Sequence, residues 1–257
     1  MLTRTLRGAE ALIDALLPHT NPTPARLAWA GCADAAGIAH LAGSRRAALA
    51  AEPASRVVLA ALPLHREGGR GAASGADAVL TCAVLASAVA AFEQHRAPTR
   101  PSALGVAALV GAQAGYIPRL VQRGATVGKR GAAAAAGVVA AGGVVAARAD
   151  RRLLPATLIG GAAVVATAAL ANDPAFRADA NATTIDPARE GLSHGANLLV
   201  AAEGLRLLTN SGVAARVCRA AGLPAWLGER GTRAAVSWAG SIGQLLLVHG
   251  LTAPDRQ

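Results

Sequence analysis

Hydrophobic and polar positions are arranged along this chain in long blocks. Eight stretches rich in Ala, Gly, Val and Leu, each closed by polar turns that carry arginine, occupy residues 27–43, 46–64, 75–91, 102–121, 131–147, 153–171, 191–208 and 234–251. A helix needs roughly 20 residues to cross the hydrocarbon core of a bilayer. The pattern therefore predicts an all-α protein, a polytopic transmembrane helical bundle of about eight spans, with no strands.

The eight stretches differ in how strongly they favour membrane insertion. Alanine is close to neutral, whereas Leu, Ile, Phe and Val each favour insertion by roughly 0.3–0.6 kcal/mol at the helix centre. The first stretch carries Asp34 and His40, the second Glu52 and Arg56, and the third Asp77. We expect such stretches to insert mainly by packing against stronger neighbours, and a soluble alanine-rich bundle is the alternative.

Composition indicates a single structural unit. With 53% hydrophobic and 16% charged residues among 257, one bundle accounts for the whole length. We expect an N-terminal amphipathic segment over residues 1–25, a transmembrane domain over 26–251 and a short tail over 252–257. The first segment is predicted to be a helix on the membrane surface, because apolar residues recur at helical spacing at Leu2, Leu6, Ala9, Ile13 and Leu16. Residues 209–233 predict a second interfacial helix.

The formal net charge of +10 raises the question of a nucleic-acid partner. The basic residues, however, fall at almost every segment boundary instead of clustering on one face with stacking aromatic residues. Anionic lipid headgroups explain that distribution better. We therefore expect membrane lipids as partners, no nucleic acid, and a location in a membrane, by composition the bacterial cytoplasmic membrane. The orientation in the membrane and the oligomeric state stay open.

Cofactor and nucleophile motifs are sparse. The three cysteines lie far apart and the six histidines contain no HxxxH pair, so neither a metal nor a cofactor is predicted. Residues 191–195 fit GxSxG, but a nucleophile elbow needs a preceding strand, which is not expected here. Gly111 and Gly115 are better explained as small residues that let two helices approach closely.

Polar residues inside the apolar stretches carry the candidate chemistry, because burying an ionisable group costs at least roughly 2.5–3.5 kcal/mol on insertion scales. Glu203 lies well inside the seventh stretch, where a carboxyl group can keep a proton and act as a general acid. The alternative is an intrahelical pair with Arg206. Arg56 is suited to bind a lipid phosphate, or else pairs with Glu52 one turn earlier. Further candidates for substrate binding, or for ties between helices, are Gln113, Tyr116, Asn197 and Gln244.

Four segments, in order along the chain, resemble one membrane-enzyme family. They are residues 55–64 (SRVVLAALPL), 105–117 (GVAALVGAQAGYI), 195–203 (GANLLVAAE) and 241–250 (SIGQLLLVHG). They resemble the lysoplasmalogenases of the YhhN type, with Arg56 at the position of a lysine, Gln113 at that of a histidine and Glu203 at that of an aspartate.

The resemblance implies eight spans and hydrolysis of the vinyl ether bond of lysoplasmalogens, which yields an aldehyde and a glycerophospho-alcohol. A protonated Glu203 would protonate the vinyl ether. The Gly-Asp pair of the family's third span has no counterpart near Ser87 and Ala88, and Asp77 is the nearest acid. A non-catalytic membrane protein that binds lipid or a partner helix is therefore the alternative function.

Overall fold

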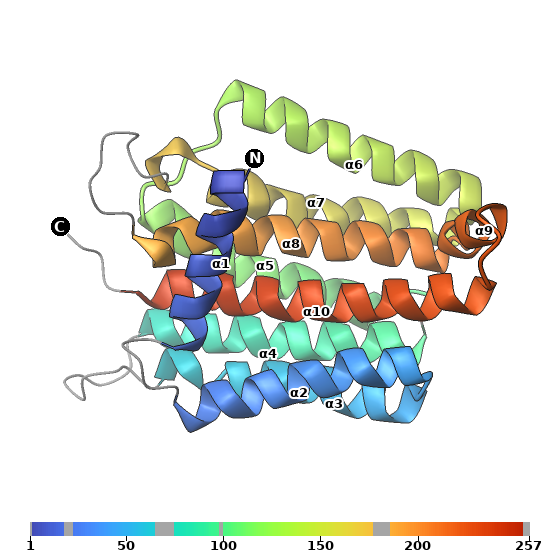
Figure 1. Ribbon diagram of the computed structural model, residues 1–257. Helices are drawn as coiled ribbons and strands as arrows, with labels where there is room; N and C mark the ends of the chain where they lie inside the picture. The colour runs from blue at the N-terminus through green and yellow to red at the C-terminus, as the bar shows by residue number, and fades with distance from the viewer. Residues whose placement is uncertain (1, 18–22, 65–74, 98–99, 177–185, 254–257) are drawn as a thin grey trace.

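The computed structural model describes residues 2–17, 23–64, 75–97, 100–176 and 186–253, which form helices without strands. The eight long helices are α2 (Pro24–Ala42), α3 (Arg45–Leu59), α4 (Gly75–Arg96), α5 (Ala103–Gln122), α6 (Lys129–Ala149), α7 (Leu154–Ala171), α8 (Pro187–Asn210) and α10 (Ala225–Thr252). They lie side by side with alternating direction (Figure 1). The predicted all-α bundle is confirmed.

Shorter elements lie at the two ends of this bundle. Helix α1 (Leu2–Leu16) crosses it near one end, and α9 (Val213–Ala220) lies at the other (Figure 1). Single 3₁₀ turns extend or connect the long helices, at η2 (Leu62–Leu64), η3 (Arg151–Leu153) and η4 (Pro174–Phe176). Residues 18–22, between α1 and α2, and the predicted tail from 254 onward lie outside the described residues.

In the part of the chain that the structure describes, six helices are long and apolar enough to cross a membrane: α3 with η2, α4, α5, α6, α7 with η3, and α10. Their length and composition indicate a membrane protein. The other two long helices, α2 and α8, coincide with the first and seventh predicted stretches but contain charged residues, among them Asp34 and Glu203. These six helices agree with the predicted transmembrane bundle. That the chain crosses the membrane eight times stays a prediction.

Helix boundaries follow local sequence signals. Ser102 precedes α5, and its hydroxyl accepts a 2.9 Å hydrogen bond from the Gly105 amide. Asp186 precedes α8 and accepts in the same way from the Ala188 amide at 3.1 Å. Both side chains satisfy amides that have no partner within the helix. Gly43 ends α2 in the left-handed conformation, with φ of 75°, which a glycine adopts without steric cost.

Helix α10 is the centre of the bundle and packs most closely on α8. In its most apolar part 72% of residues are buried, compared with 11% in α6 at the periphery. A Cβ atom built on Gly195 of α8 would lie 2.7 Å from the Gly243 carbonyl oxygen of α10. Residues 191–195 are thus part of α8, and Gly195 allows a close approach to α10 that a larger residue would prevent. Gly115 likewise brings α5 against Ala83 of α4, as predicted.

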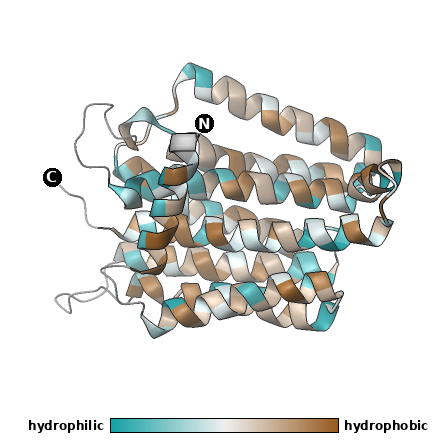
Figure 2. Cartoon of the chain, in the orientation of Figure 1, coloured by the Kyte–Doolittle hydropathy of each residue, from teal (hydrophilic) through white to brown (hydrophobic). Residues whose placement is uncertain are grey.

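Apolar side chains cover much of the outer surface. Exposed residues include Leu85 and Phe92 on α4 and Ile159 on α7. Figure 2 shows hydrophobic residues on the outer sides of the long helices and hydrophilic residues mainly toward their ends. That distribution is typical of a helical bundle in contact with lipid.

The two segments that the sequence predicts as interfacial helices differ in outcome. The first contains the helix α1, which packs Ala11 and Ala15 on the bundle and exposes Leu6 and Ile13, and Leu17 directly after it is also exposed. The second segment, residues 209–233, is not one helix, because it contains the end of α8, the short helix α9 and the first turns of α10. Its exposed apolar residues are Val217, Leu223, Trp226 and Leu227.

Candidate functional site

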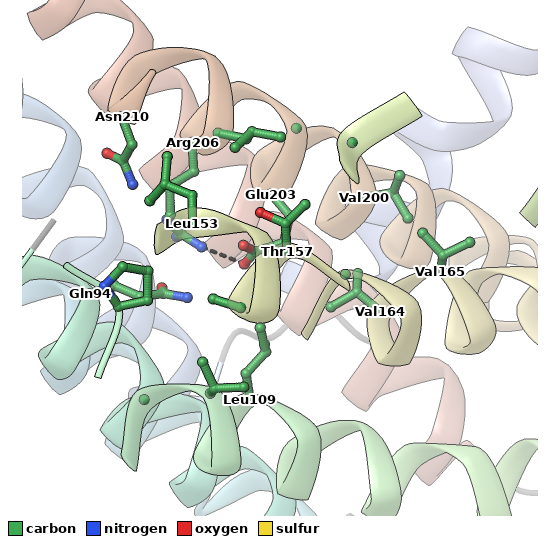
Figure 3. Close-up of a pocket in the computed structure, with 18 of the residues that line it drawn as sticks. Gln94, Leu109, Leu153, Thr157, Val164, Val165, Val200, Glu203, Arg206 and Asn210 are labelled. Atoms are coloured by element: carbon green, nitrogen blue, oxygen red, sulfur yellow. Dashed lines mark hydrogen bonds and ion pairs between the residues drawn. The ribbon is translucent and has the colours of Figure 1, made fainter. Parts of the chain in front are cut away.

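A cavity of about 170 Å³ lies among helices α4 to α8 (Figure 3). Most of its wall is apolar and comes from α5, α6, α7 and α8. The apolar lining includes Val106, Leu109, Val138, Val139, Leu153, Val164, Val165, Val200 and Leu207. Two acidic side chains, Glu93 and Glu203, and the cationic Arg206 also line it. The cavity thus combines an apolar chamber with a small group of charges.

Glu203 and Arg206 are one turn apart on α8 and form an ion pair through Glu203 Oε1 and Arg206 Nη1. Both face the cavity, and their contact is drawn as a dashed line in Figure 3. The ion pair of Glu203 with Arg206, which the sequence predicts as the alternative to a catalytic Glu203, is therefore present. Both of its residues also line the cavity, so the pair does not remove Glu203 from the candidate site. The Glu203 side chain is 28% exposed, which leaves it accessible to a bound molecule.

Glu93 is the second cavity carboxylate and comes from the last turn of α4. Its Oε2 accepts a 2.6 Å hydrogen bond from Ser102 Oγ and a 3.1 Å hydrogen bond from Arg96 Nη2. Since Ser102 also caps α5, the turn between α4 and α5 holds Glu93 in place. Asp77, the nearest acid in the third stretch, lies in the first turn of α4, where its Oδ1 is 3.8 Å from Arg119 Nη2. It is therefore at the opposite end of α4 from Glu93.

A second polar cluster lies within the bundle, where α2, α3 and α4 meet. Glu52 of α3 is fully buried and accepts a 3.3 Å hydrogen bond from Arg56 Nη2 through Oε1. Its Oε2 is 2.5 Å from His95 Nε2 of α4 and 3.5 Å from His40 Nε2 of α2. Arg56 Nη1 also donates to the Ser87 carbonyl oxygen at 3.0 Å. The pairing of Arg56 with Glu52 that the sequence spacing allows is therefore present.

The remaining candidate residues make contacts between helices. The Tyr116 hydroxyl of α5 donates to Gln244 Oε1 of α10 at 2.6 Å, and both residues are buried. Gln113 is also buried, and its Oε1 has no hydrogen-bond partner within the described part of the chain. Asn197 is exposed and exchanges hydrogen bonds of 2.9 and 3.2 Å with Asn172. It links α8 to the end of α7.

The structure thus groups the predicted residues unequally. Of the six, Glu203 alone is among the residues that line the cavity within the described ranges. Arg56 lies in the polar cluster instead, where it contacts Glu52 and the Ser87 carbonyl oxygen. The sequence pattern does not single out Glu93, since it predicts that the third stretch ends at residue 91, whereas α4 continues to Arg96. Glu93 follows the predicted end of the third stretch by only two residues. A charged residue so close to the end of an apolar stretch is the sequence signal that could have identified Glu93.

No protein-family model, no curated protein and no solved structure matches this chain. The resemblance to lysoplasmalogenases therefore stays a prediction.

Proposed function

We propose that the chain is a membrane hydrolase that cleaves the vinyl ether bond of lysoplasmalogen-like lipids, in the bacterial cytoplasmic membrane. The observation that carries the proposal is the cavity itself, whose apolar walls lie beside Glu93, Glu203 and Arg206. Such a chamber suits a single-chain lipid, because apolar walls accept the hydrocarbon while a few polar groups orient the reacting bond. Two carboxyl groups that line one cavity also suit vinyl ether hydrolysis, in which one group gives a proton and the other accepts one.

The reaction begins with transfer of a proton to the β-carbon of the vinyl ether, which leaves an oxocarbenium ion. A protonated carboxyl group supplies this proton. Water then adds to the cationic carbon and gives up a proton to a carboxylate, and the resulting hemiacetal collapses to aldehyde and alcohol. We assign Glu203 as the acid and Glu93 as the carboxylate that stabilises the cation and receives the proton from water.

Arg206 connects substrate binding to this chemistry. A lipid phosphate binds a guanidinium group strongly, because the phosphate is anionic and accepts two parallel hydrogen bonds from the guanidinium group. When the headgroup engages Arg206, the Glu203 carboxyl group loses its ion-pair partner and becomes available to contact the reacting bond in the cavity. Arg56 is already engaged by Glu52 and the Ser87 carbonyl oxygen, so its proposed contribution is an electrostatic one from within the bundle.

A non-catalytic lipid-binding protein is the second candidate. The observation that favours it is the ion pair of Glu203 with Arg206, which is complete without any substrate. In that case the cavity holds a lysolipid and the carboxyl groups serve only to orient its headgroup.

Release of fatty aldehyde from lysoplasmenyl-choline and lysoplasmenyl-ethanolamine by the purified protein in detergent distinguishes the two. We expect Glu203→Gln and Glu93→Gln each to lower the rate by about 10²–10⁴-fold, the usual contribution of a general acid or base. The matched control is Glu229→Gln, because Glu229 is also paired with an arginine on its own helix, at 4.0 Å from Arg233, but lies on the surface. No aldehyde from folded wild-type protein, combined with retained binding of lysolipid, would favour the non-catalytic candidate.

A further inference from the structure

Three potential metal ligands converge from three helices. His40 lies near the end of α2, Glu52 at the middle of α3 and His95 in the last turn of α4. The end of α2, the start of α3 and the end of α4 lie at the same end of the bundle (Figure 1), so Glu52 lies about two turns in from that end. The two imidazole nitrogens and a Glu52 oxygen all lie within 4.8 Å of one another.

The polar atoms of this cluster are incompletely satisfied by the protein. The His40 side chain is 8% exposed, and among the described residues its Nε2 has no hydrogen bond of adequate geometry, although Glu52 Oε2 is 3.5 Å away. Both histidines direct Nε2 toward that same oxygen, and the two rings are 5.0 Å apart between centroids. A buried nitrogen without a hydrogen bond calls for a further bonding partner, such as a water molecule or an ion.

We propose that His40, Glu52 and His95 bind one divalent transition-metal ion of the zinc type. Two imidazoles and one carboxylate form a ligand set that leaves a position open for water or another molecule. A tetrahedral ion with bonds of roughly 2.0–2.2 Å separates its ligand atoms by roughly 3.3–3.6 Å. The 3.5 Å contact already fits that separation, and the 2.5 Å contact between Glu52 and His95 has to open by about 1 Å.

Arg56 prepares the carboxylate for this role. Its Nη2 donates to Oε1 of Glu52, which fixes the carboxylate so that Oε2 faces the two histidines. Hydrogen bonds of this kind orient ligands in metal sites. The arginine also adds a positive charge beside the ion, so the open position favours an anionic ligand, such as hydroxide or a carboxylate. Since His40, Glu52 and His95 are not among the cavity-lining residues, the proposal stands whether or not the cavity hydrolyses lipids.

The test is metal binding by the full chain, produced without a polyhistidine tag, stripped with a chelator and kept in detergent. Titration with ZnCl₂ should saturate at one ion per chain, and CoCl₂ should give the visible absorption of a four- or five-coordinate nitrogen and oxygen site. His40→Gln and His95→Gln should each abolish stoichiometric binding. The matched control is His249→Gln, which removes another histidine paired with a carboxylate, 2.9 Å from Asp14, and should bind like wild type.

Two results would overturn the proposal. One is the absence of stoichiometric binding to stripped wild-type protein, which does not depend on whether a variant folds. The other is binding by folded His40→Gln or His95→Gln with wild-type affinity, which would place the ion elsewhere. In either case the cluster is a buried arrangement of hydrogen bonds and charges between helices α2, α3 and α4.

Discussion

The contact between α8 and α10 provides a direct test of how this bundle is packed. Gly195 faces α10 at a point where an added Cβ atom would lie 2.7 Å from the Gly243 carbonyl oxygen and 2.9 Å from Leu246 Cβ. Real Cβ atoms do not approach other atoms so closely, and a backbone carbonyl cannot rotate away as a flexible side chain can. Gly195→Ala therefore forces the two helix backbones apart. Gly137→Ala on α6 is the matched control, because a Cβ atom built there lies more than 4 Å from the described residues outside its own stretch of helix.

The magnitude follows from two opposing effects. Replacing glycine by alanine within a helix stabilises it by about 1 kcal/mol, and this gain applies equally to both positions. Overpacking a well-packed interior costs typically about 1–3 kcal/mol. The free energy of unfolding of Gly195→Ala should therefore be lower than that of Gly137→Ala by about 1–3 kcal/mol.

Unfolding in mixed micelles with increasing sodium dodecyl sulfate, followed by circular dichroism, measures this difference. Gly137→Ala should be at least as stable as wild type, whereas Gly195→Ala should unfold at lower detergent fraction. Equal free energies of unfolding for the two variants would refute the close contact between α8 and α10.

Two further predictions concern the buried polar groups. Glu52→Ala should lower the free energy of unfolding of the metal-free protein by about 3–5 kcal/mol, because Arg56 loses its buried partner. The double variant with Arg56→Met should regain much of that lost stability, because it no longer buries an unpaired charge. Thermal unfolding in detergent measures both, and equal losses in single and double variants would argue against a direct pair. Tyr116→Phe should cost about 1–3 kcal/mol by leaving Gln244 Oε1 unpaired. By the same measurement Tyr116→Phe with Gln244→Leu should be more stable than Tyr116→Phe, and the reverse order would contradict the bond.

Periodic apolar blocks are sufficient to predict most of the fold. Each predicted stretch corresponds to one long helix, because a helix that contacts lipid must be apolar over most of its length and polar where it ends. The expected boundaries fail where a helix continues into polar sequence. The pattern ends the third stretch at residue 91 and begins the eighth at 234, whereas α4 ends at Arg96 and α10 begins at Ala225.

The candidate site is predicted less completely for the same reason. Glu203 stands out in sequence because it interrupts an apolar stretch, and the structure places it at the cavity. Glu93 and His95 do not stand out, because they occupy a polar helix end that resembles a connecting loop. His40 and Glu52 are visible as polar interruptions, but their convergence depends on the antiparallel packing of α2 and α3, which brings the end of one beside the start of the other.

If the cavity binds a lipid as proposed, the sparse packing of α6 bears on how that lipid enters. Val138, Val139 and Gly142 of α6 form part of the cavity wall, and Gly142 approaches Thr157 of α7. A wall with so little buried surface separates from its neighbours at a lower free-energy cost than α10 does. Under the proposed function, we expect a hydrocarbon chain to enter past α6, sideways from the bilayer. Turnover should then follow the mole fraction of substrate within the membrane or micelle, and diluting the substrate with inert lipid should slow it even when the bulk concentration is unchanged.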